Sequence, residues 1–270
     1  MALAHIESAV DPRLDTFRFV GDAAELGRRG LVVVEGRLVV ERLLADSTLH
    51  VDALLLSDAA ARAMGDVLAR VPASVEVFVV PQPWMQGITG FNLHRGSIAI
   101  ARRPRAVGVA ELLAGGARRL LVLEGVGNPD NVGGLFRIAR AFGVQGVVLG
   151  PGCGDPLYRK AIRVSCGAAL VVPFAQDPDW PRALDAIRRH GIELVALSPH
   201  PALPSIDDVA ANRSPLHGLA LLLGAEGPGL TDAALDAADV KARVPIDAAA
   251  DSLNVTVAAA VALHVLRDQG

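Results

Sequence analysis

Residues 118–150, RRLLVLEGVGNPDNVGGLFRIARAFGVQGVVLG, carry the pattern from which the architecture of the chain follows. The apolar runs 118–126 and 145–150 have the composition of buried strands, and 131–143 between them has helical spacing. A strand, a helix and a second strand in this order are typical of two parallel strands of one sheet joined by a crossover helix.

The remainder of the C-terminal part continues this alternation. We expect a mostly parallel sheet covered by helices on both faces, because its strands are nearly continuous apolar runs. The expected strands are 169–174, 192–198, 218–224 and 240–246. The expected helical stretches are 157–165, 180–191, 232–238 and 252–268.

The N-terminal part also alternates between strands and helices, which predicts a small α/β domain. A strand leads into a helix over 30–44, and a helix is expected over 59–71. Further strands are expected at 51–58, 75–80 and 96–103. The polar stretch 102–108 contains Pro104 and is the expected boundary. The predicted organisation is a flexible N-terminus (1–10), a small α/β domain (11–105) and a larger α/β domain (106–270).

Composition excludes several classes of protein. Of the 270 residues, 51% are hydrophobic and 20% are charged, so a disordered chain is not expected. The net charge of −3 is not that of a protein that binds nucleic acid by bulk charge. No apolar run reaches about 18 residues and no signal peptide is visible, so we expect no membrane span. Two cysteines, Cys153 and Cys166, fit a reducing cytoplasm and are too few for a zinc site.

Polar, glycine-rich loops follow three of the expected strands, and ligands of parallel sheets bind at the carboxyl ends of strands. The first loop does not match a dinucleotide-binding motif, because position 130 is an aspartate and not the third glycine. Asn131 could cap the following helix through its side chain. Arg137 and Arg140 lie further along that helix as a solvated pair or as a phosphate clamp.

The second and third loops hold other candidate residues. Gly224, Gly227 and Gly229 surround Glu226 and would let the backbone approach a ligand closely. Glu226 is either a surface charge or a group that binds a hydroxyl or orients an arginine. In the third loop, Ser252 is a suitable cap for the last helix, and we expect the amide of Asn254 to point outward.

Together the three loops resemble the motifs of the SPOUT class of methyltransferases, in the SpoU/TrmH branch. The first motif, N-x-x-N-x-G-x-x-x-R, corresponds to Asn128, Asn131, Gly133 and Arg137. The second, G-x-E-G-x-G, corresponds to Gly224, Glu226, Gly227 and Gly229. The third corresponds to Pro245 and SLNVTVA at 252–258. The N-terminal part is similar to the small ribosomal-protein (L30e-like) RNA-binding domain that many members carry.

This resemblance implies transfer of a methyl group from S-adenosylmethionine to a ribose 2′-hydroxyl of structured RNA by a cytoplasmic homodimer. It also implies a trefoil knot around the cofactor. The RNA is expected to be ribosomal (23S) RNA; transfer RNA, or a catalytically silent RNA-binding member, is the alternative. An NAD oxidoreductase is disfavoured by the spacing of the first loop. The implied cofactor-binding residues are Leu197, Gly224, Val244, Ile246 and Leu253.

The resemblance also assigns catalytic and RNA-binding residues. The implied catalytic residues are Asn131, Arg137, Glu226, Ser252 and Asn254. The implied RNA-binding residues are Arg37, Arg137, Arg163 and Ser165, although Arg163 and Ser165 fit an exposed helix end equally well. A guanidinium does not lose its proton in a protein, so we expect Arg137 to position a phosphate and to stabilise negative charge on the 2′-oxygen. Trp84, Phe91 and His94 either stack on bases or pack on one another.

Overall fold

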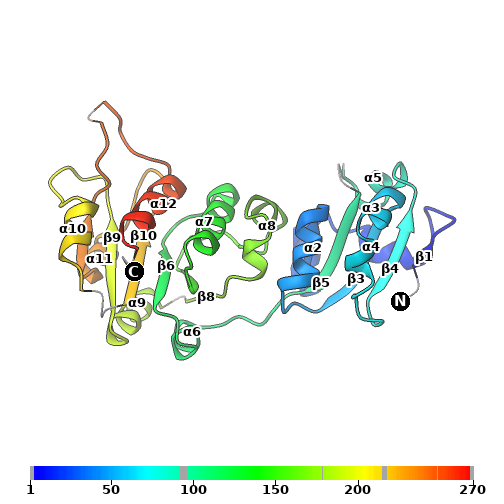
Figure 1. Ribbon diagram of the computed structural model, residues 1–270, viewed down its shortest axis with the longest axis horizontal. Coiled ribbons are helices and arrows are strands. Elements are labelled where there is room, and N and C mark those ends of the chain that lie inside the picture. Colours follow the sequence, from blue (N-terminus) through cyan, green and yellow to red (C-terminus); the bar gives the residue numbers. More distant parts are fainter. Residues whose placement is uncertain (1–2, 92–95, 178, 215–217, 248, 268–270) are drawn as a thin grey trace. The chain divides into compact units, whose positions relative to one another are not determined.

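The computed structural model describes residues 3–91, 96–177, 179–214, 218–247 and 249–267 (Figure 1). The chain divides into two compact units. The first unit holds Met1–Arg105 together with Leu157–Val171, and the second holds Ala106–Pro156 and Val172–Gly270. The segment 157–171 therefore packs with the N-terminal part, although its place in the sequence is between two strands of the second unit.

The sheet of the first unit is mixed. Its strand order is β1 (Ala4–His5), β4 (Glu76–Val80), β3 (Val51–Ser57), β5 (Ser97–Arg102) and β2 (Leu31–Glu35). The pairs β1–β4 and β4–β3 are parallel, whereas β3–β5 and β5–β2 are antiparallel. The expectation of a flexible segment 1–10 is wrong for its central residues, because β1 pairs with β4 and Ile6 is buried.

Helices cover both faces of this sheet. The side chains of Val33, Leu55, Phe78 and Ile100 form one core with η1 (Pro12–Phe17) and α5 (Trp84–Thr89). The alternate strand residues are also buried. The helix α2 (Arg37–Asp46) contacts β2 and β5, α3 (Asp58–Ala63) contacts β3 and β4, and α4 (Gly65–Leu68) contacts α2 and α3. The helix expected over 59–71 is thus two short helices. The helix α1 (Ala23–Arg28) also contacts this sheet, at β2.

The segment 157–171 forms α8 (Arg159–Val164) and the 3₁₀ turn η2 (Ala168–Leu170), and α8 contacts β2. The hydroxyl of Ser47 donates to the carbonyl of Leu170 at 3.0 Å. The strand expected at 169–174 is wrong, because the next strand, β8, is Phe174–Gln176. A short apolar run fits a buried turn as well as a buried strand, and Cys166 and Gly167 both have positive φ just before it.

The sheet of the second unit is parallel throughout, as the apolar runs predicted. Its strand order is β11 (Val240–Ala242), β9 (Ile192–Leu197), β10 (Gly218–Leu223), β6 (Arg119–Leu123), β7 (Gly146–Leu149) and β8. Because all strands run the same way, the loops after β6, β9, β10 and β11 lie at one edge of the sheet. These include the three glycine-rich or polar loops of the sequence.

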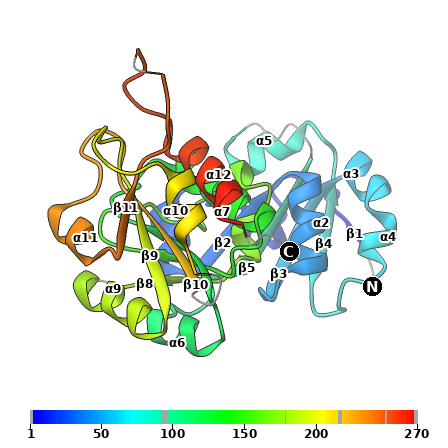
Figure 2. The same cartoon turned by 60° about the vertical axis from the view of Figure 1, so that its left-hand side comes forward.

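Both faces of this sheet are covered, as expected (Figure 2). On one face, α6 (Val109–Ala114), α9 (Trp180–Arg189) and α11 (Asp232–Ala237) pack against Leu120, Val122, Leu194 and Leu222. On the other face, α12 (Val255–Val265) lies beside α7 (Pro129–Ala141) and α10 (Ile206–Asn212), and it contacts β10.

Within the described residues, no helix is both long enough and apolar enough to cross a membrane.

Candidate active site

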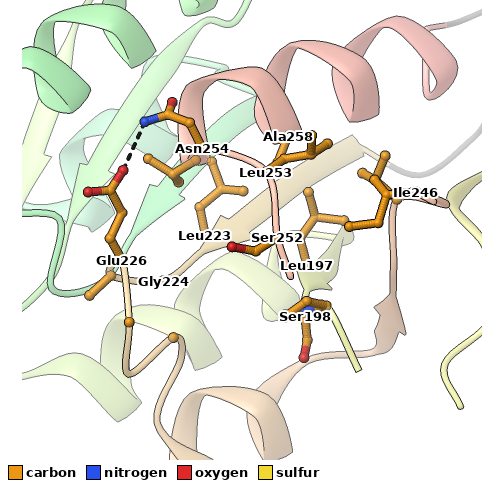
Figure 3. A pocket seen from close by; sticks show the side chains of 16 residues that line it. Leu197, Ser198, Leu223, Gly224, Glu226, Ile246, Ser252, Leu253, Asn254 and Ala258 are labelled. Atoms are coloured by element: carbon orange, nitrogen blue, oxygen red, sulfur yellow. Dashed lines mark hydrogen bonds between the residues drawn. The ribbon is translucent and has the colours of Figure 1, made fainter. Parts of the chain in front are cut away.

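A cavity of about 470 Å³ opens at the carboxyl ends of β9, β10 and β11 (Figure 3). Its size is that of a site for one small molecule. Most of its wall is apolar side chain or glycine backbone, and none of the described residues that line it is a lysine or an arginine. The lining residues are Leu197, Ser198, Pro199, Leu223, Gly224, Ala225, Glu226, Gly227, Gly229, Val244, Ile246, Ser252, Leu253, Asn254, Val255 and Ala258.

The loop after β10 folds back on itself and forms one wall. The amide of Gly229 donates to the carbonyl of Ala225 at 3.1 Å. A Cβ at Gly224 would lie 2.3 Å from the carbonyl carbon of Gly229 and 2.4 Å from the nitrogen of Leu230. Only glycine therefore fits at position 224. Gly227 and Gly229 have φ values of 87° and 74°, a region that glycine adopts without strain.

A buried carboxylate holds the far end of the same loop. Glu124 follows β6 and is 7% exposed. Its Oε2 accepts from the amide of Thr231 at 2.8 Å, and its Oε1 accepts from the hydroxyl of Thr231 at 3.0 Å. That hydroxyl also caps α11 by accepting from the amide of Ala234. Glu124 therefore ties the loop after β6 to the end of the loop after β10.

Asn254 is the N-cap of α12, a role that we had assigned to Ser252. Its Oδ1 accepts from the amide of Thr256 at 2.9 Å and also from the hydroxyl of Thr256. Its Nδ2 donates to Glu226 Oε1 at 2.8 Å and to Asn131 Oδ1 at 3.0 Å (Figure 3 shows the bond to Glu226). The serine expectation is wrong because the helix begins three residues later than the sequence suggested.

Asn131 is not a cap either. Asn128 caps α7 by accepting from the amide of Asp130 at 2.9 Å. Asn131 lies in the first turn, is 6% exposed, and accepts from Asn254. One residue from each of the three loops, Asn131, Glu226 and Asn254, is thus joined in a single hydrogen-bonded group at the cavity.

All five residues that the resemblance implied for the cofactor line this cavity, as do Glu226, Ser252 and Asn254. They come from the end of β9 and from the loops after β10 and β11, so their meeting depends on the parallel sheet. Ser198 and Pro199 also line the cavity and were missed. The one sequence feature that could have identified them is their position directly after an apolar strand.

Arg137 is exposed on α7 and does not line the cavity. Among the described residues, its guanidinium has no hydrogen bond or ion pair. Of the five expected catalytic residues, Glu226, Ser252 and Asn254 therefore line the cavity, Asn131 is hydrogen-bonded to Asn254, and Arg137 lies on the surface of α7.

The expected RNA-binding residues of the first unit have different environments. Arg37 is exposed and lies 3.7 Å from Glu41. Arg163 donates to the buried Glu35 at 2.8 Å and remains 58% exposed. Ser165 is fully buried; its hydroxyl donates to Ile162 at 2.9 Å and accepts from Ala169. The expectation that Ser165 faces RNA is therefore wrong for this conformation, because burial leaves it no accessible surface.

Two of the aromatic residues considered for base stacking, Trp84 and Phe91, pack against other residues of the first unit. The guanidinium of Arg159 lies 3.8 Å from the centre of the Phe91 ring and donates to Glu35 at 3.0 Å. Trp84 is half-buried against the core of this unit. His94 lies outside the described residues.

Glu124 and Gly134 were not predicted as site residues, and Thr256 entered only as part of the third motif, 252–258. A Cβ at Gly134 would lie 2.6 Å from Cγ2 of Thr256, so α7 and α12 approach each other closely there. The signal for Thr256 was its place two residues after a capping asparagine, where a hydroxyl can reach the cap.

Comparison with known proteins places these features in a family. The model of the SpoU rRNA methylase family matches residues 118–264. An uncharacterized tRNA/rRNA methyltransferase of Mycobacterium tuberculosis (strain H37Rv) is 43% identical over 261 residues, which cover 94% of this chain and 88% of that protein. The 23S rRNA (guanosine(2553)-2′-O)-methyltransferase RlmP of Bacillus subtilis is 26% identical over 269 residues, which cover 98% of this chain and 100% of that protein.

A solved structure shares the fold. The structure of an AdoMet-bound rRNA methyltransferase from Sinorhizobium meliloti superposes with a TM-score of 0.78 at 22% identity, and the match covers 98% of this chain and 97% of that one.

Proposed function

Because the chain belongs to the SpoU rRNA methylase family, we propose that it transfers a methyl group from S-adenosylmethionine to a ribose 2′-hydroxyl of structured RNA. The observation that carries the proposal is the hydrogen-bonded group of Asn131, Glu226 and Asn254, of which Glu226 and Asn254 line an apolar cavity. These polar side chains come from three loops that are distant in the sequence, which a merely structural cavity does not require.

The cavity suits this cofactor. S-adenosylmethionine carries no phosphate, and none of the described lining residues is basic. Among the described lining residues, only Glu226 has a charged side chain, and a carboxylate is compatible with a positively charged sulfonium or ammonium. Gly224 lets the backbone approach closely, while Leu197, Val244, Ile246 and Leu253 would hold the apolar part. When bound, the cofactor supplies an electrophilic methyl group.

The residues of the chain position the acceptor. Asn254 holds Glu226 through Nδ2, and Asn131 holds Asn254 from the side of α7. Arg137 would bind a phosphate next to the target nucleotide and stabilise negative charge that develops on the 2′-oxygen, since a guanidinium stays protonated. Holding the hydroxyl next to the methyl group would contribute much of the rate.

Ribosomal RNA is the proposed substrate. The supporting observation is that the match to a 23S rRNA 2′-O-methyltransferase extends over 98% of this chain, so it includes the N-terminal unit as well as the family region. That unit is the proposed RNA-binding domain, with Arg37 and Arg163 as candidate phosphate contacts.

We also propose a homodimer and a knot. A dimer would bring Arg137 of one subunit to the cavity of the other, which fits its position outside its own cavity. Val257 on α12 is 47% exposed and is a candidate for the interface. The knot is supported by the close pairing of the segment after β9 with the segment after β11, where Ile206 donates to Arg243 and Arg243 donates to Pro204.

The test uses cofactor with a labelled methyl group, the purified protein, and two RNA pools, protein-free ribosomal RNA and bulk transfer RNA. Digested nucleosides are separated, and label in a 2′-O-methyl nucleoside from ribosomal RNA is the expected result. Label in transfer RNA alone would overturn the choice of substrate. A protein that binds the cofactor but labels neither pool would favour a catalytically silent RNA-binding protein.

A further inference from the structure

The side chain of Asn254 has opposite tasks at its two ends. The carbonyl end caps α12, and the amino end holds Glu226 and Asn131. A reversed amide would place its NH₂ group against the backbone N–H of Thr256 and its oxygen against a carboxylate, and neither contact is a hydrogen bond. The cap therefore fixes which end of Asn254 faces the cavity.

Thr256 strengthens this arrangement from outside the cavity. Its hydroxyl is a second donor to Oδ1 of Asn254, and it does not line the cavity itself. A threonine in a helix can adopt two χ1 rotamers, so something must select the one that points the hydroxyl at Asn254.

Gly134 on α7 makes that selection possible. A Cβ at position 134 would lie 2.6 Å from Cγ2 of Thr256, 3.4 Å from its Cβ and 3.9 Å from its Oγ1. The methyl group of Thr256 thus occupies the space that a side chain at position 134 would fill. With the methyl seated there, the hydroxyl points to Asn254.

We propose that Thr256 is a positioning residue for methyl transfer, and that its rotamer is accessible because position 134 is glycine and leaves room for the methyl group. The proposal rests on the proposed roles of Asn254 and Glu226. If Thr256 rotates, Oδ1 of Asn254 loses a donor. If instead α7 and α12 move apart, the bond from Asn254 to Asn131 lengthens, because Asn131 lies on α7. Either change loosens the group that faces the acceptor.

Four variants test the proposal. Thr256→Val keeps the shape and removes the hydroxyl, and Thr256→Ser removes the methyl and keeps the hydroxyl. Gly134→Ala forces the methyl away. The double variant Gly134→Ala/Thr256→Ser removes the clashing atom, since the remaining Cβ distance of 3.4 Å is an ordinary contact. Gly65→Ala is the control, because a Cβ on this helical glycine meets nothing within 4 Å.

Turnover and the KM for the cofactor are measured with the RNA that the wild type methylates. We expect Thr256→Val and Gly134→Ala to lower kcat by about threefold to tenfold, the usual effect of one hydrogen bond, with little change in KM for the cofactor. Thr256→Ser and the double variant should stay within about threefold of wild type. A wild-type kcat in Thr256→Val, or a double variant as slow as Gly134→Ala, would overturn the proposal.

A second measurement separates this inference from the proposed function. The side-chain NH₂ signals of Asn254 are assigned in ¹⁵N-labelled protein by their loss in Asn254→Asp. They should shift in Gly134→Ala and return toward the wild-type position in the double variant. If the wild type methylates no RNA, the proposed function fails, while this shift still decides whether Gly134 and Thr256 control the amide. Signals that are unchanged in Gly134→Ala would refute the coupling.

Discussion

Asn254 shows why residue type matters at this site. Aspartate and serine cap helices as well as asparagine does, but aspartate has no donor and serine has a single hydroxyl that is donor and acceptor at the same atom. Asparagine adds an NH₂ group on the other side of the same planar amide. One residue can therefore begin α12 and donate to Glu226 and Asn131.

Asn254→Asp separates these two tasks. We expect the variant to fold, because aspartate is a strong N-cap, but the donor is replaced by a carboxylate that faces Glu226. Loss of two hydrogen bonds, one of them to a charged group, should lower kcat by about a hundredfold. Thermal unfolding and methyl transfer are measured together. Activity close to wild type would show that the NH₂ group is not needed.

Arg137→Lys tests the role of the guanidinium. Arg137 has no ion pair among the described residues, so the substitution breaks no internal contact in the chain. We expect kcat to fall by at least about tenfold, since lysine keeps the charge but cannot bind a phosphate with two parallel hydrogen bonds. Arg182→Lys is the matched control, because Arg182 is exposed on α9, on the other face of the sheet, and also has no hydrogen bond or ion pair among the described residues. Equal activity of Arg137→Lys and wild type would contradict the two-bond contact.

At the scale of elements, the loop between β10 and α11 is held at both ends. At the start of the loop, the backbone of Gly224 lies against that of Gly229. At its end, Glu124 accepts hydrogen bonds from the amide and hydroxyl of Thr231. Glu226 lies between these anchors and is held in turn by Asn254. Such a loop can present backbone groups to a ligand without paying a large ordering entropy on binding.

Glu124→Ala should weaken this loop. The amide and hydroxyl of Thr231 would lose their acceptor; because Thr231 is exposed and water can replace part of each contact, the loss costs about 1 kcal/mol per hydrogen bond. We expect a lower free energy of unfolding and a lower affinity for the cofactor by calorimetry. Glu124→Gln keeps one acceptor and should lie between the alanine variant and wild type. Unchanged cofactor affinity in Glu124→Ala would mean that the loop needs no anchor there.

Sequence patterns predicted the elements of the second unit well where a strand or helix is long and apolar. β6, β7, β9, β10, α7 and α9 were expected close to their observed bounds. The patterns failed at 169–174, where an apolar run packs as a turn, and at 252, where Ser252 is a good capping residue by type but Asn254 is the cap. In both places neighbouring residues compete, and packing selects among states that local preference leaves nearly equal.

At the scale of the whole molecule, the place of Arg137 outside its own cavity leads to a prediction about assembly. If the site is built from two subunits, mixing Arg137→Ala subunits with Asn254→Asp subunits should restore activity. Random exchange makes half of the dimers mixed, and each mixed dimer has one intact site, so activity should return to about a quarter of wild type. Sizing of the wild type by analytical ultracentrifugation accompanies the mixing.

The mixing experiment distinguishes a site shared between two subunits from a site within one chain. If both residues act within one chain, every mixed dimer carries a lesion in each site and mixing restores nothing. Each variant mixed with itself is the matched control.

Local pattern was sufficient for the alternation of strands and helices, for the parallel sheet and for the three loops, because hydrophobic period and glycine content act over a few residues. It was also sufficient to find candidate residues for a cavity. The contacts among these candidate residues could not be predicted from local pattern. Glu124 and Thr231 are 107 positions apart, and Asn131 and Asn254 are 123 apart. Only the folded sheet brings such residues within hydrogen-bonding distance. Only the close packing of α7 on α12 brings Gly134 into contact with Thr256, since no local preference specifies a partner so far along the chain.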